Sequence, residues 1–169
     1  MHYARRALAS ESDYLFAHRY ITRPADAGQE NHVALSAEEF SARCAANLFA
    51  MHWSSHGLRY GIGIEIEQWL DRDMTVVING SRAYLPEAQM RYPHLVPILV
   101  EVPEALLRQR LIERGRESIN DIEQRLQRNR TLRAQVRLSH IVMNDGALSS
   151  AGDKLVDLIR SQRAQQTCA

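Results

Sequence analysis

Three short apolar runs, separated by helical patterns, limit the fold of this chain more than any other feature. They are Thr75-Val-Val-Ile78, Pro97-Ile-Leu-Val-Glu-Val102 and His140-Ile-Val-Met143. Runs of this kind are typical of strands that are buried on both faces of a parallel sheet. Strands that alternate with helices predict a layered α/β fold, and 169 residues are enough for one domain with a substantial core.

The rest of the chain divides into helix, strand and loop patterns. Helices are expected over 2–10, 37–47, 64–72, 103–114, 118–136 and 149–165, and further strands over 14–20, 48–53 and 58–62. The capping box Ser36-Ala-Glu-Glu39 begins the second helix, and Pro103 and Ser118 begin two later ones. Ser54-Ser-His-Gly57 predicts a hairpin turn, whereas 22–32 has the composition of a polar loop.

The most informative feature of the composition is its single lysine. Of the 21 basic side chains, 20 are arginine and Lys154 is the only lysine. A Walker A loop needs a lysine directly after its last glycine, where it contacts the β- and γ-phosphates. Lys154 follows no glycine-rich loop, and its pattern is that of an exposed helix position. Residues 1–169 therefore contain no Walker A motif, and Schiff-base chemistry would depend on this one side chain.

Charge and cysteine content limit the partners of the chain. A net charge of +1 gives no overall attraction to nucleic acid or to a membrane surface, and no apolar run is long enough to span a bilayer. Cys44 falls in a helical pattern and Cys168 near the end of the sequence, which fits a reducing compartment better than a disulfide. We expect a cytoplasmic protein that binds a small molecule, with no nucleic-acid or membrane partner.

Two segments in the first half of the chain are candidates for binding a ligand. Thr22 and Arg23 follow a strand, where ligands of open α/β sheets collect, and a hydroxyl beside a guanidinium suits a phosphate. In Gly57-Leu-Arg-Tyr60-Gly61-Ile-Gly63, glycines frame a tyrosine hydroxyl, although the spacing matches neither a Rossmann nor a Walker loop. The alternative for Arg23 is an ordinary loop arginine without a ligand.

A third candidate is a pair of arginine-bearing helices. Arg110 and Arg114 share one helix face, Arg125 and Arg128 share another, and Gly115 separates the two helices. Such helices could close over a polyphosphate. The alternative is a solvated surface whose arginines pair with neighbouring acidic residues. Those residues are Glu113, Glu117 and Glu123.

Two other kinds of site are weakly represented. His52 and His56 are four residues apart, but they fall in a hairpin rather than a helix, so they share no ligand face and no metal site is expected. Serine, histidine and aspartate are all present, but no nucleophile elbow holds the serine.

The order of the motifs is more specific than any one of them. They are Ala17-His-Arg-Tyr-Ile-Thr-Arg23, Gly28-Gln-Glu-Asn-His32, Ala34-Leu-Ser36, Glu39-Phe40, Trp53, His56-Gly-Leu-Arg-Tyr-Gly61, Val77-Ile-Asn-Gly-Ser-Arg82, Leu85-Pro86, Arg110-Leu111, Arg114-Gly-Arg-Glu117, Arg125-Leu126 and Asn144-Asp145-Gly146. From about residue 4 to about residue 160, the chain resembles guanylate kinase-like nucleoside monophosphate kinases. Within them it looks most like the ribose 1,5-bisphosphate phosphokinases of phosphonate breakdown.

The resemblance implies where the phosphate acceptor binds. Arg23 and Tyr60 correspond to residues that hold the acceptor's phosphate in guanylate kinases, and His32 falls near a further phosphate-binding position. Thr22 is expected to bind the substrate beside Arg23. The acceptor-binding part is expected at 22–63.

The resemblance also implies where the nucleotide binds. Arg114, Arg116 and Arg125 match arginines of a lid, expected at 110–130, that closes on ATP and the transferring phosphoryl group. Asn144 matches a residue that lines the adenine site. ATP, with Mg²⁺ bound through the nucleotide, is the implied cofactor. Phosphoryl transfer depends on positioning and positive charge, which arginines supply.

Departures from guanylate kinases concern the acceptor. Those enzymes read guanine with a glutamate before the hairpin and a serine after its Tyr-Gly, but here Met51 or His52 and Ile62 occupy these places. A second phosphate-binding arginine is replaced by Asp26 or a neighbour, and the middle strand at 77–79 ends without a carboxylate. Because guanine specificity depends on paired polar groups, these changes disfavour GMP and fit a base-free ribosyl phosphate.

The N-terminus departs most from the family pattern. Relatives begin with a strand, a Gly-x-x-x-x-Gly-Lys loop and a helix, whereas here Met1 falls where the lysine motif should end and 2–10 matches the remaining helix. Roughly 20 residues, a strand and the phosphate loop, have no counterpart. We expect Met1 to be an internal methionine of a longer reading frame. The alternative is a shortened product that is inactive or binds ligand without turnover.

The sequence therefore predicts a single guanylate kinase-like domain over 1–169, with a three-layer parallel sheet of nucleoside monophosphate kinase type whose central first strand and P-loop are missing. The implied activity is ATP-dependent phosphorylation of ribose 1,5-bisphosphate to 5-phosphoribosyl 1-diphosphate, with residues 1–169 alone expected to be inactive. The alternatives are a guanylate kinase and a non-catalytic ligand-binding module.

Overall fold

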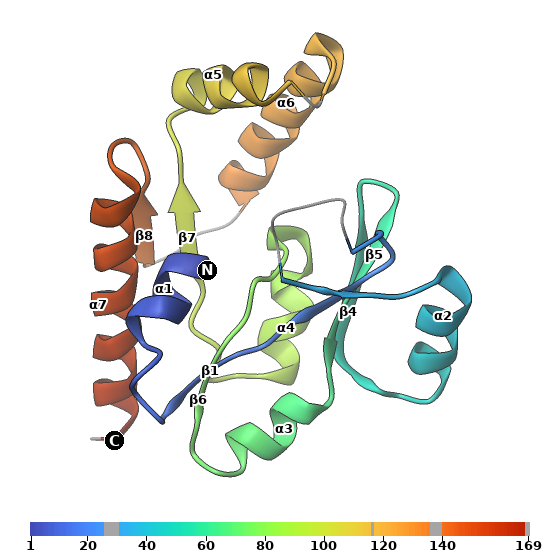
Figure 1. The fold of residues 1–169 in the computed structure, drawn as a ribbon, viewed down its shortest axis with the longest axis vertical. Coiled ribbons are helices and arrows are strands. Elements are labelled where there is room, and N and C mark those ends of the chain that lie inside the picture. The colour runs from blue at the N-terminus through green and yellow to red at the C-terminus, as the bar shows by residue number, and fades with distance from the viewer. Residues whose placement is uncertain (26–30, 116, 136–139, 168–169) are drawn as a thin grey trace. The chain divides into compact units, whose positions relative to one another are not determined.

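The computed structural model describes residues 1–25, 31–115, 117–135 and 140–167. The chain forms two compact units, Met1–Tyr84 and Leu85–Ala169, which are considered separately (Figure 1). No helix among the described residues combines the length and the apolar character needed to cross a membrane.

The first unit contains two small sheets. Its elements are α1 (His2–Ala7), β1 (Tyr14–Phe16), β2 (Arg19–Ile21), β3 (Val33–Ala34), α2 (Ala37–Ala45), β4 (Phe49–Ser55), β5 (Leu58–Gly63), α3 (Glu65–Leu70), β6 (Thr75–Val77) and the 3₁₀ turn η1 (Arg82–Tyr84). Strands β1 and β6 pair in parallel, with Tyr14 opposite Thr75. The other sheet has the order β3-β2-β5-β4, with β2 and β4 both antiparallel to β5.

The single strand expected over 14–20 is wrong, because the segment forms β1 and β2 in different sheets. The backbone N–H of Ala17 donates to Val77 O and so completes the pairing with β6. The chain then changes sheet at His18, whose Nε2 lies 2.9 Å from Asn31 Nδ2 and 3.4 Å from Arg5 Nη1. The break between β1 and β2 is therefore determined by the pairing of β1 with the distant strand β6, and not by the local sequence pattern.

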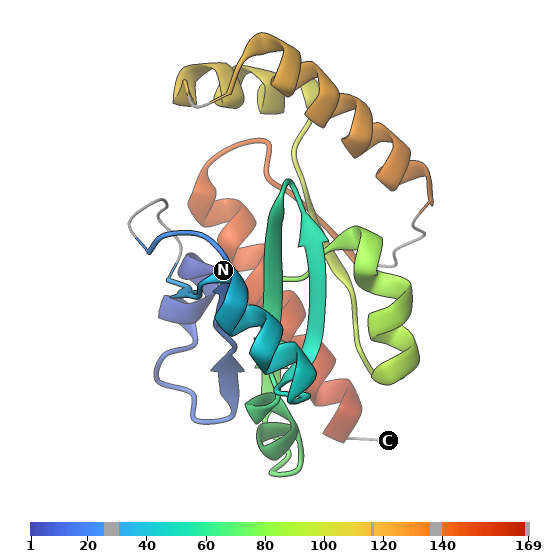
Figure 2. The same cartoon turned by 90° about the vertical axis from the view of Figure 1, so that its right-hand side faces the viewer.

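The hairpin of β4 and β5 has the turn that the sequence predicted. Ser55 lies opposite Leu58, and the two residues between them, His56 and Gly57, have positive φ values of 52° and 72°. Two positive φ values are the signature of the tight turns that match the twist of paired strands. Figure 2 shows the two strands side by side. This turn places Trp53 directly opposite Tyr60.

Alternation along the strands gives the four-stranded sheet two distinct faces. We define the front face as Arg19, Ile21, Met51, Trp53, Tyr60 and Ile62, which the pairing register places on one side. The back face carries Tyr20 and Phe49, and α2 covers it through Phe40. Gly61 belongs to this back face, and a Cβ there would lie 2.5 Å from the Phe49 ring. Close packing of that ring therefore requires glycine at position 61.

Helix α2 begins as its capping box predicted. The Ser36 hydroxyl accepts a hydrogen bond from the Glu39 backbone N–H at 3.0 Å, which satisfies one of the first amides of the helix. The helix ends at Ala45, two residues before the expected end at 47.

The second unit combines a parallel strand pair with four helices among its described residues. Its elements are α4 (Leu85–Arg91), β7 (Ile98–Glu101), α5 (Glu104–Arg114), α6 (Ile119–Gln135), β8 (His140–Met143) and α7 (Leu148–Thr167). Strands β7 and β8 pair with Ile98 opposite His140, and α7 packs against β8 (Figure 1). Helix α4 was not predicted, although Pro86 stands in its first turn, where proline is tolerated.

Each of the three apolar runs forms a strand, but none of these strands is buried on both faces within the described residues. In β8, Val142 is 4% exposed, but Ile141 and Met143 are 40% and 37% exposed. The residues of β6 are all half-buried. Each strand of these pairs has one hydrogen-bonded neighbour among the described strands, so apolar side chains remain partly accessible.

Helices α5 and α6 form a helical hairpin with a small core of its own. Leu111, Ile122 and Leu126 are buried together, with Leu107 against them. Gly115 ends α5 in the left-handed conformation at φ 65°, where glycine carries no steric penalty. Ser118 caps α6, since its hydroxyl accepts from the Asp121 N–H at 3.2 Å.

Candidate functional site

Thr22 extends the pairing of β2 with β5 beyond Ile21. Its backbone N–H donates to Arg59 O at 3.1 Å, and its hydroxyl accepts from the Arg59 N–H at 2.9 Å. The hydroxyl is therefore occupied by the backbone, so Thr22 fixes the exit of the chain from the sheet and thereby positions Arg23.

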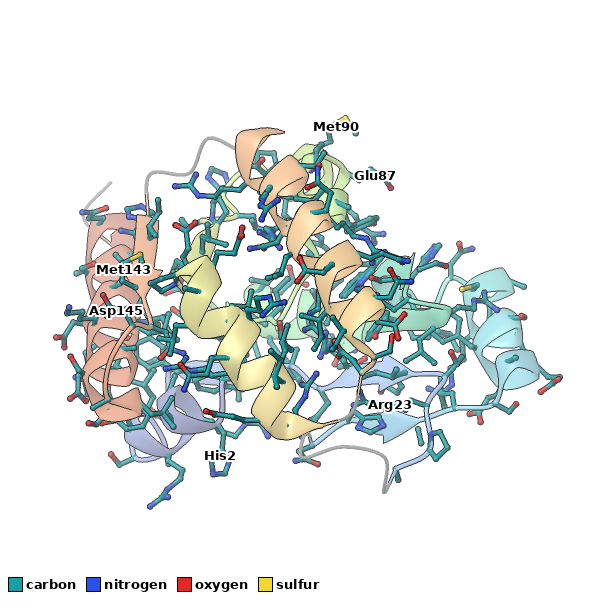
Figure 3. The ribbon with its side chains drawn as sticks, turned by 90° about the horizontal axis from the view of Figure 1, so that it is seen from above. His2, Arg23, Glu87, Met90, Met143 and Asp145 are labelled. Atoms are coloured by element: carbon teal, nitrogen blue, oxygen red, sulfur yellow. The ribbon has the colours of Figure 1, made fainter. Side chains whose placement is uncertain are left out.

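Arg23 and His32, which the resemblance assigned to one phosphate, lie together. Arg23 Nη2 is 3.4 Å from His32 Nδ1, and His32 Nε2 is 3.3 Å from Arg23 O. If the guanidinium donates to Nδ1, the ring proton sits on Nε2 and donates to the carbonyl, so both contacts agree on one tautomer. Figure 3 labels Arg23, whose guanidinium this ring orients.

Tyr60 lies on the front face directly opposite Ile21, which is two residues before Arg23. Its ring stacks on Trp53 with centroids 5.6 Å apart and planes within 5°. The Arg19 guanidinium carbon lies 5.1 Å from its centroid, within cation–π range. Its hydroxyl makes no hydrogen bond with any described residue, and so can donate to a ligand oxygen.

The front face includes functional candidates that sequence reasoning missed. Trp53 and Arg19 belong to the sequence motifs but have no role assigned by them, and Tyr84 of η1 lies outside the motifs. The structure aligns them with Tyr60, since Tyr84 stacks on Trp53 with centroids 5.8 Å apart. The contact of Trp53 with Tyr60 follows from the two-residue turn and could have been found from the sequence, whereas the contact with Tyr84 depends on tertiary structure.

In the second unit, one carboxylate joins two predicted lid arginines. Glu117 Oε1 accepts from Arg114 Nη2 at 2.6 Å and from Arg125 Nη1 at 2.7 Å. Glu117 is 24% exposed, against 40% and 42% for the two arginines. Arg116 lies outside the described residues.

Further carboxylates pair with arginines along the same helical hairpin, as the alternative prediction of paired charges required. Arg108 Nε donates to Glu123 at 2.8 Å, and Arg130 binds Glu104 through two nitrogens. These contacts lower the pKa of Glu104 and raise that of Arg130, the hydrogen bond being the largest cause in each case. The surface therefore presents paired charges rather than a field of one sign.

Asn144 lies where a ligand of an α/β fold is expected. It directly follows β8, and its N–H donates to Glu101 O of β7 at 2.7 Å, which closes the carboxyl end of the parallel pair. Arg110 Nη1 donates to Asn144 O at 3.2 Å and so joins α5 to this loop. Figure 3 labels its sequence neighbours Met143 and Asp145. The Asn144 side chain makes no hydrogen bond to a described residue.

A metal centre made by the protein alone has no support in the described part of the chain, which contains no group of three His, Cys, Asp or Glu side chains suited to a metal. The partly exposed guanidinium groups of Arg114 and Arg125 suit a polyphosphate instead. A divalent ion bound through a nucleotide is compatible with that donor set.

Comparison with known proteins identifies the family. No protein-family model matches the chain. The chain is 49% identical over 166 residues to "Ribose 1,5-bisphosphate phosphokinase PhnN" of Thiobacillus denitrificans, covering 98% of this chain and 87% of that protein. It is 52% identical over 158 residues to the protein of the same name in Desulfomicrobium baculatum, covering 92% and 83%.

A solved structure supplies the fold. The guanylate kinase of Anaplasma phagocytophilum matches with a TM-score of 0.68 and 17% identity, covering 95% of this chain and 80% of that one. The predicted α/β fold of guanylate kinase type is thereby confirmed. The chain belongs to the PhnN family of ribose 1,5-bisphosphate phosphokinases and is a small-molecule kinase.

Proposed function

We propose that this kinase transfers the γ-phosphoryl group of ATP to ribose 1,5-bisphosphate, giving 5-phosphoribosyl 1-diphosphate and ADP. An oxygen of the 1-phosphate attacks the γ-phosphorus, and the bond from that phosphorus to the bridging oxygen of ADP breaks. The phosphate nucleophile is already ionised, so no general base is required. The names of the relatives support this acceptor.

The observation that carries the proposal is the chemistry of the front face. None of its six strand residues is acidic, so it offers no carboxylate to pair with a guanine edge. It offers a guanidinium and a tyrosine hydroxyl instead, which suit a sugar phosphate.

On this proposal the acceptor's reacting phosphate binds Arg23 and the Tyr60 hydroxyl, with His32 orienting the guanidinium. Thr22 holds the strand end that carries Arg23. The negative charges are brought together by positive groups held in place, which is the main contribution a protein makes to phosphoryl transfer.

On the nucleotide side, Arg114 and Arg125 offset the charge of the transferring group, and Asn144 helps to seat adenine. Arg116 is assigned to the same role by the resemblance alone. Mg²⁺ bound through ATP would neutralise part of the β- and γ-phosphate charge. We place this reaction in the cytoplasm, within phosphonate breakdown.

The acceptor is tested by calorimetric titration of residues 1–169 with ribose 1,5-bisphosphate, ribose 5-phosphate and GMP. We expect the bisphosphate to bind most tightly. Equal or tighter binding of GMP would identify a guanylate kinase acceptor site and overturn the proposal. Binding is the suitable measurement, because it does not depend on turnover.

Turnover is a separate question, since residues 1–169 contain no Gly-x-x-x-x-Gly-Lys sequence to cradle the phosphates. We propose that this chain on its own turns over slowly or not at all. Incubation with ATP and ribose 1,5-bisphosphate, followed by phosphorus NMR, measures it. Rapid formation of the diphosphate would refute this part.

A further inference from the structure

The proposed acceptor carries two phosphates, but the residues assigned so far account for one. We infer that Arg19 binds the second, non-reacting 5-phosphate, while Arg23 binds the reacting 1-phosphate. This assignment depends on the proposed function, because it requires a bisphosphate acceptor. Nothing in the motif pattern alone assigns Arg19 a role.

The pairing register places Arg19 on the same surface as the rest of the acceptor site. Arg19 lies opposite Ile62, and Ile21 lies opposite Tyr60, so all four side chains share the front face. Ile21 and Ile62 are fully buried beneath, whereas Arg19 and Tyr60 are half-buried. The Arg19 side chain therefore shares this face with two buried isoleucines and is itself partly exposed.

Stacking prepares the Arg19 guanidinium for a phosphate. Its central carbon lies 5.1 Å from the Tyr60 ring centroid. A guanidinium that rests on an aromatic face keeps its N–H donors in its own plane, and loses less freedom when it binds a bidentate anion. Tyr60 thus serves two functions, as its ring supports Arg19 and its hydroxyl faces the ligand.

Spacing along β2 suits two phosphates on one small molecule. Arg19 is the first residue of β2 and Arg23 lies two residues beyond its end, after Thr22, whose N–H still donates to Arg59 O. Tyr60 stands across from Ile21, midway between them. Two long side chains that start on either side of one tyrosine can converge on the two ends of a ribose bisphosphate.

The other arginines near this sheet face away from the acceptor. Arg59 Nη1 donates to Ser41 Oγ at 2.7 Å, and its guanidinium lies over Phe40 on the back face. Arg43 lies over Tyr20, also on the back face, and pairs with Glu39. Among the described strand residues of this sheet, Arg19 is thus the arginine that lies on the front face with Tyr60.

Tyr20 provides an internal contrast that supplies a matched control. Arg43 lies 5.1 Å from the Tyr20 centroid, the same separation as Arg19 from Tyr60. The Tyr20 hydroxyl, however, donates to Glu65 at 3.3 Å. Arg43→Gln therefore removes an equivalent ring-stacked charge from the opposite face of the same sheet.

The test compares Arg19→Gln and Arg43→Gln in the 1–169 chain by titration with ribose 1,5-bisphosphate, ribose 5-phosphate and ribose 1-phosphate. Loss of hydrogen bonds to a charged group predicts that Arg19→Gln weakens the two 5-phosphate ligands by about 10-fold or more. Binding of ribose 1-phosphate should change less than about 3-fold. Arg43→Gln should leave all three affinities near those of the wild-type chain.

Arg19→Lys distinguishes the loss of a phosphate contact from a structural effect of replacing Arg19. It keeps the charge but loses the planar fork, so it should restore part of the affinity for the 5-phosphate ligands. Equal weakening of all three ligands by Arg19→Gln, or unchanged binding of the bisphosphate, overturns the assignment. Failure of the wild-type chain to bind ribose 1,5-bisphosphate overturns the proposed function as well, which distinguishes the two failures.

Discussion

Among the described residues, arginines stacked on aromatic rings lie mainly in the first unit and arginines paired with carboxylates mainly in α5 and α6, although Arg43 also pairs with Glu39 and Arg91 stacks on Tyr92. In the first unit several guanidinium groups lie on aromatic rings, namely Arg5 on Phe16, Arg19 on Tyr60, Arg43 on Tyr20 and Arg59 on Phe40. In the second unit the arginines of α5 and α6 lie on carboxylates, namely Arg108 on Glu123, Arg114 and Arg125 on Glu117, Arg130 on Glu104 and Arg133 on Glu101.

This difference separates two ways of preparing a phosphate site. An aromatic ring takes none of the N–H donors of the guanidinium that stacks on it, although Arg43 and Arg59 also donate to Glu39 and Ser41. A carboxylate-held guanidinium must exchange one anion for another, and the exposed pair is weakened by salt. The acceptor arginine Arg19 belongs to the first kind, whereas Arg114 and Arg125 belong to the second. If the proposed function is correct, this contrast predicts a preformed acceptor site and nucleotide-binding arginines that exchange a carboxylate for a phosphate.

The largest expected effect concerns the core beneath the ring-held arginines. Phe40 is 1% exposed, packs on Phe49 and lies under the Arg59 guanidinium. Phe40→Ala should lower the free energy of unfolding by about 3–5 kcal/mol, measured by urea denaturation. The exposed Val33→Ala is the control, with an expected change below about 0.5 kcal/mol. A loss below about 1 kcal/mol for Phe40→Ala would contradict the packing described.

A smaller effect is expected when the Glu117 carboxylate, which Arg114 and Arg125 share, is replaced by a neutral amide. Glu117→Gln should strengthen binding of inorganic tripolyphosphate by about 3- to 10-fold, since Arg114 and Arg125 no longer have to leave an ion pair. Isothermal titration at low and high salt measures the change.

Glu123→Gln is the matched control for that experiment. It removes the same charge from the same helical hairpin but releases Arg108, which has no proposed role. If both variants strengthen binding equally, the effect is one of net charge, and the assigned role of Glu117 is wrong.

Lowering the pH should weaken the arginine–carboxylate pairs before it affects the arginines that stack on aromatic rings. Arg130 holds the pKa of Glu104 below its usual range, so this pair stabilises the fold above the unfolded-state pKa and loses that contribution as pH falls through the folded pKa. Hydrogen exchange at pH values below about 4 should show α5 and α6 losing protection first. Glu104→Gln should remove the difference, and simultaneous loss in both units would contradict it.

The smallest effect belongs to Tyr20 on the back face. Burial raises its pKa, with the Glu65 carboxylate as a further cause. A raised folded pKa stabilises the protein below the unfolded pKa, and this contribution is lost as pH rises through the folded value. Stability should therefore fall more between about pH 9 and 11 in the wild-type chain than in Tyr20→Phe. Parallel curves would show that the environment of Tyr20 has no effect on stability.

Local signals made much of the fold predictable. Ser36 and Ser118 cap helices as their side chains required, and 140–143 forms a strand with the expected bounds. Each of these depends on a few neighbouring residues. Helix α4 (Leu85–Arg91) was missed, because its short pattern follows directly on the turn that precedes it.

Features set by distant residues were out of reach of local pattern. The break at His18 depends on β1 pairing with β6, from Tyr14 to Thr75. The assigned roles of Thr22, Arg23, His32 and Tyr60 came from resemblance, and the contact of Arg23 with His32 required the folded chain. Arg19 was passed over because an arginine in a strand has no local signature of function.

The length of the two-residue turn His56-Gly57 limits which insertions the family can tolerate. Strand side chains alternate in direction, so one residue added to the turn would slide β4 against β5 and reverse its faces. Trp53 would then be driven into the interior under α2, and His52 would take its place beside the acceptor. Surface loops usually tolerate insertions, but here the chemistry of the proposed acceptor site depends on the length of one turn. Lineages that keep this acceptor should therefore keep that length unchanged.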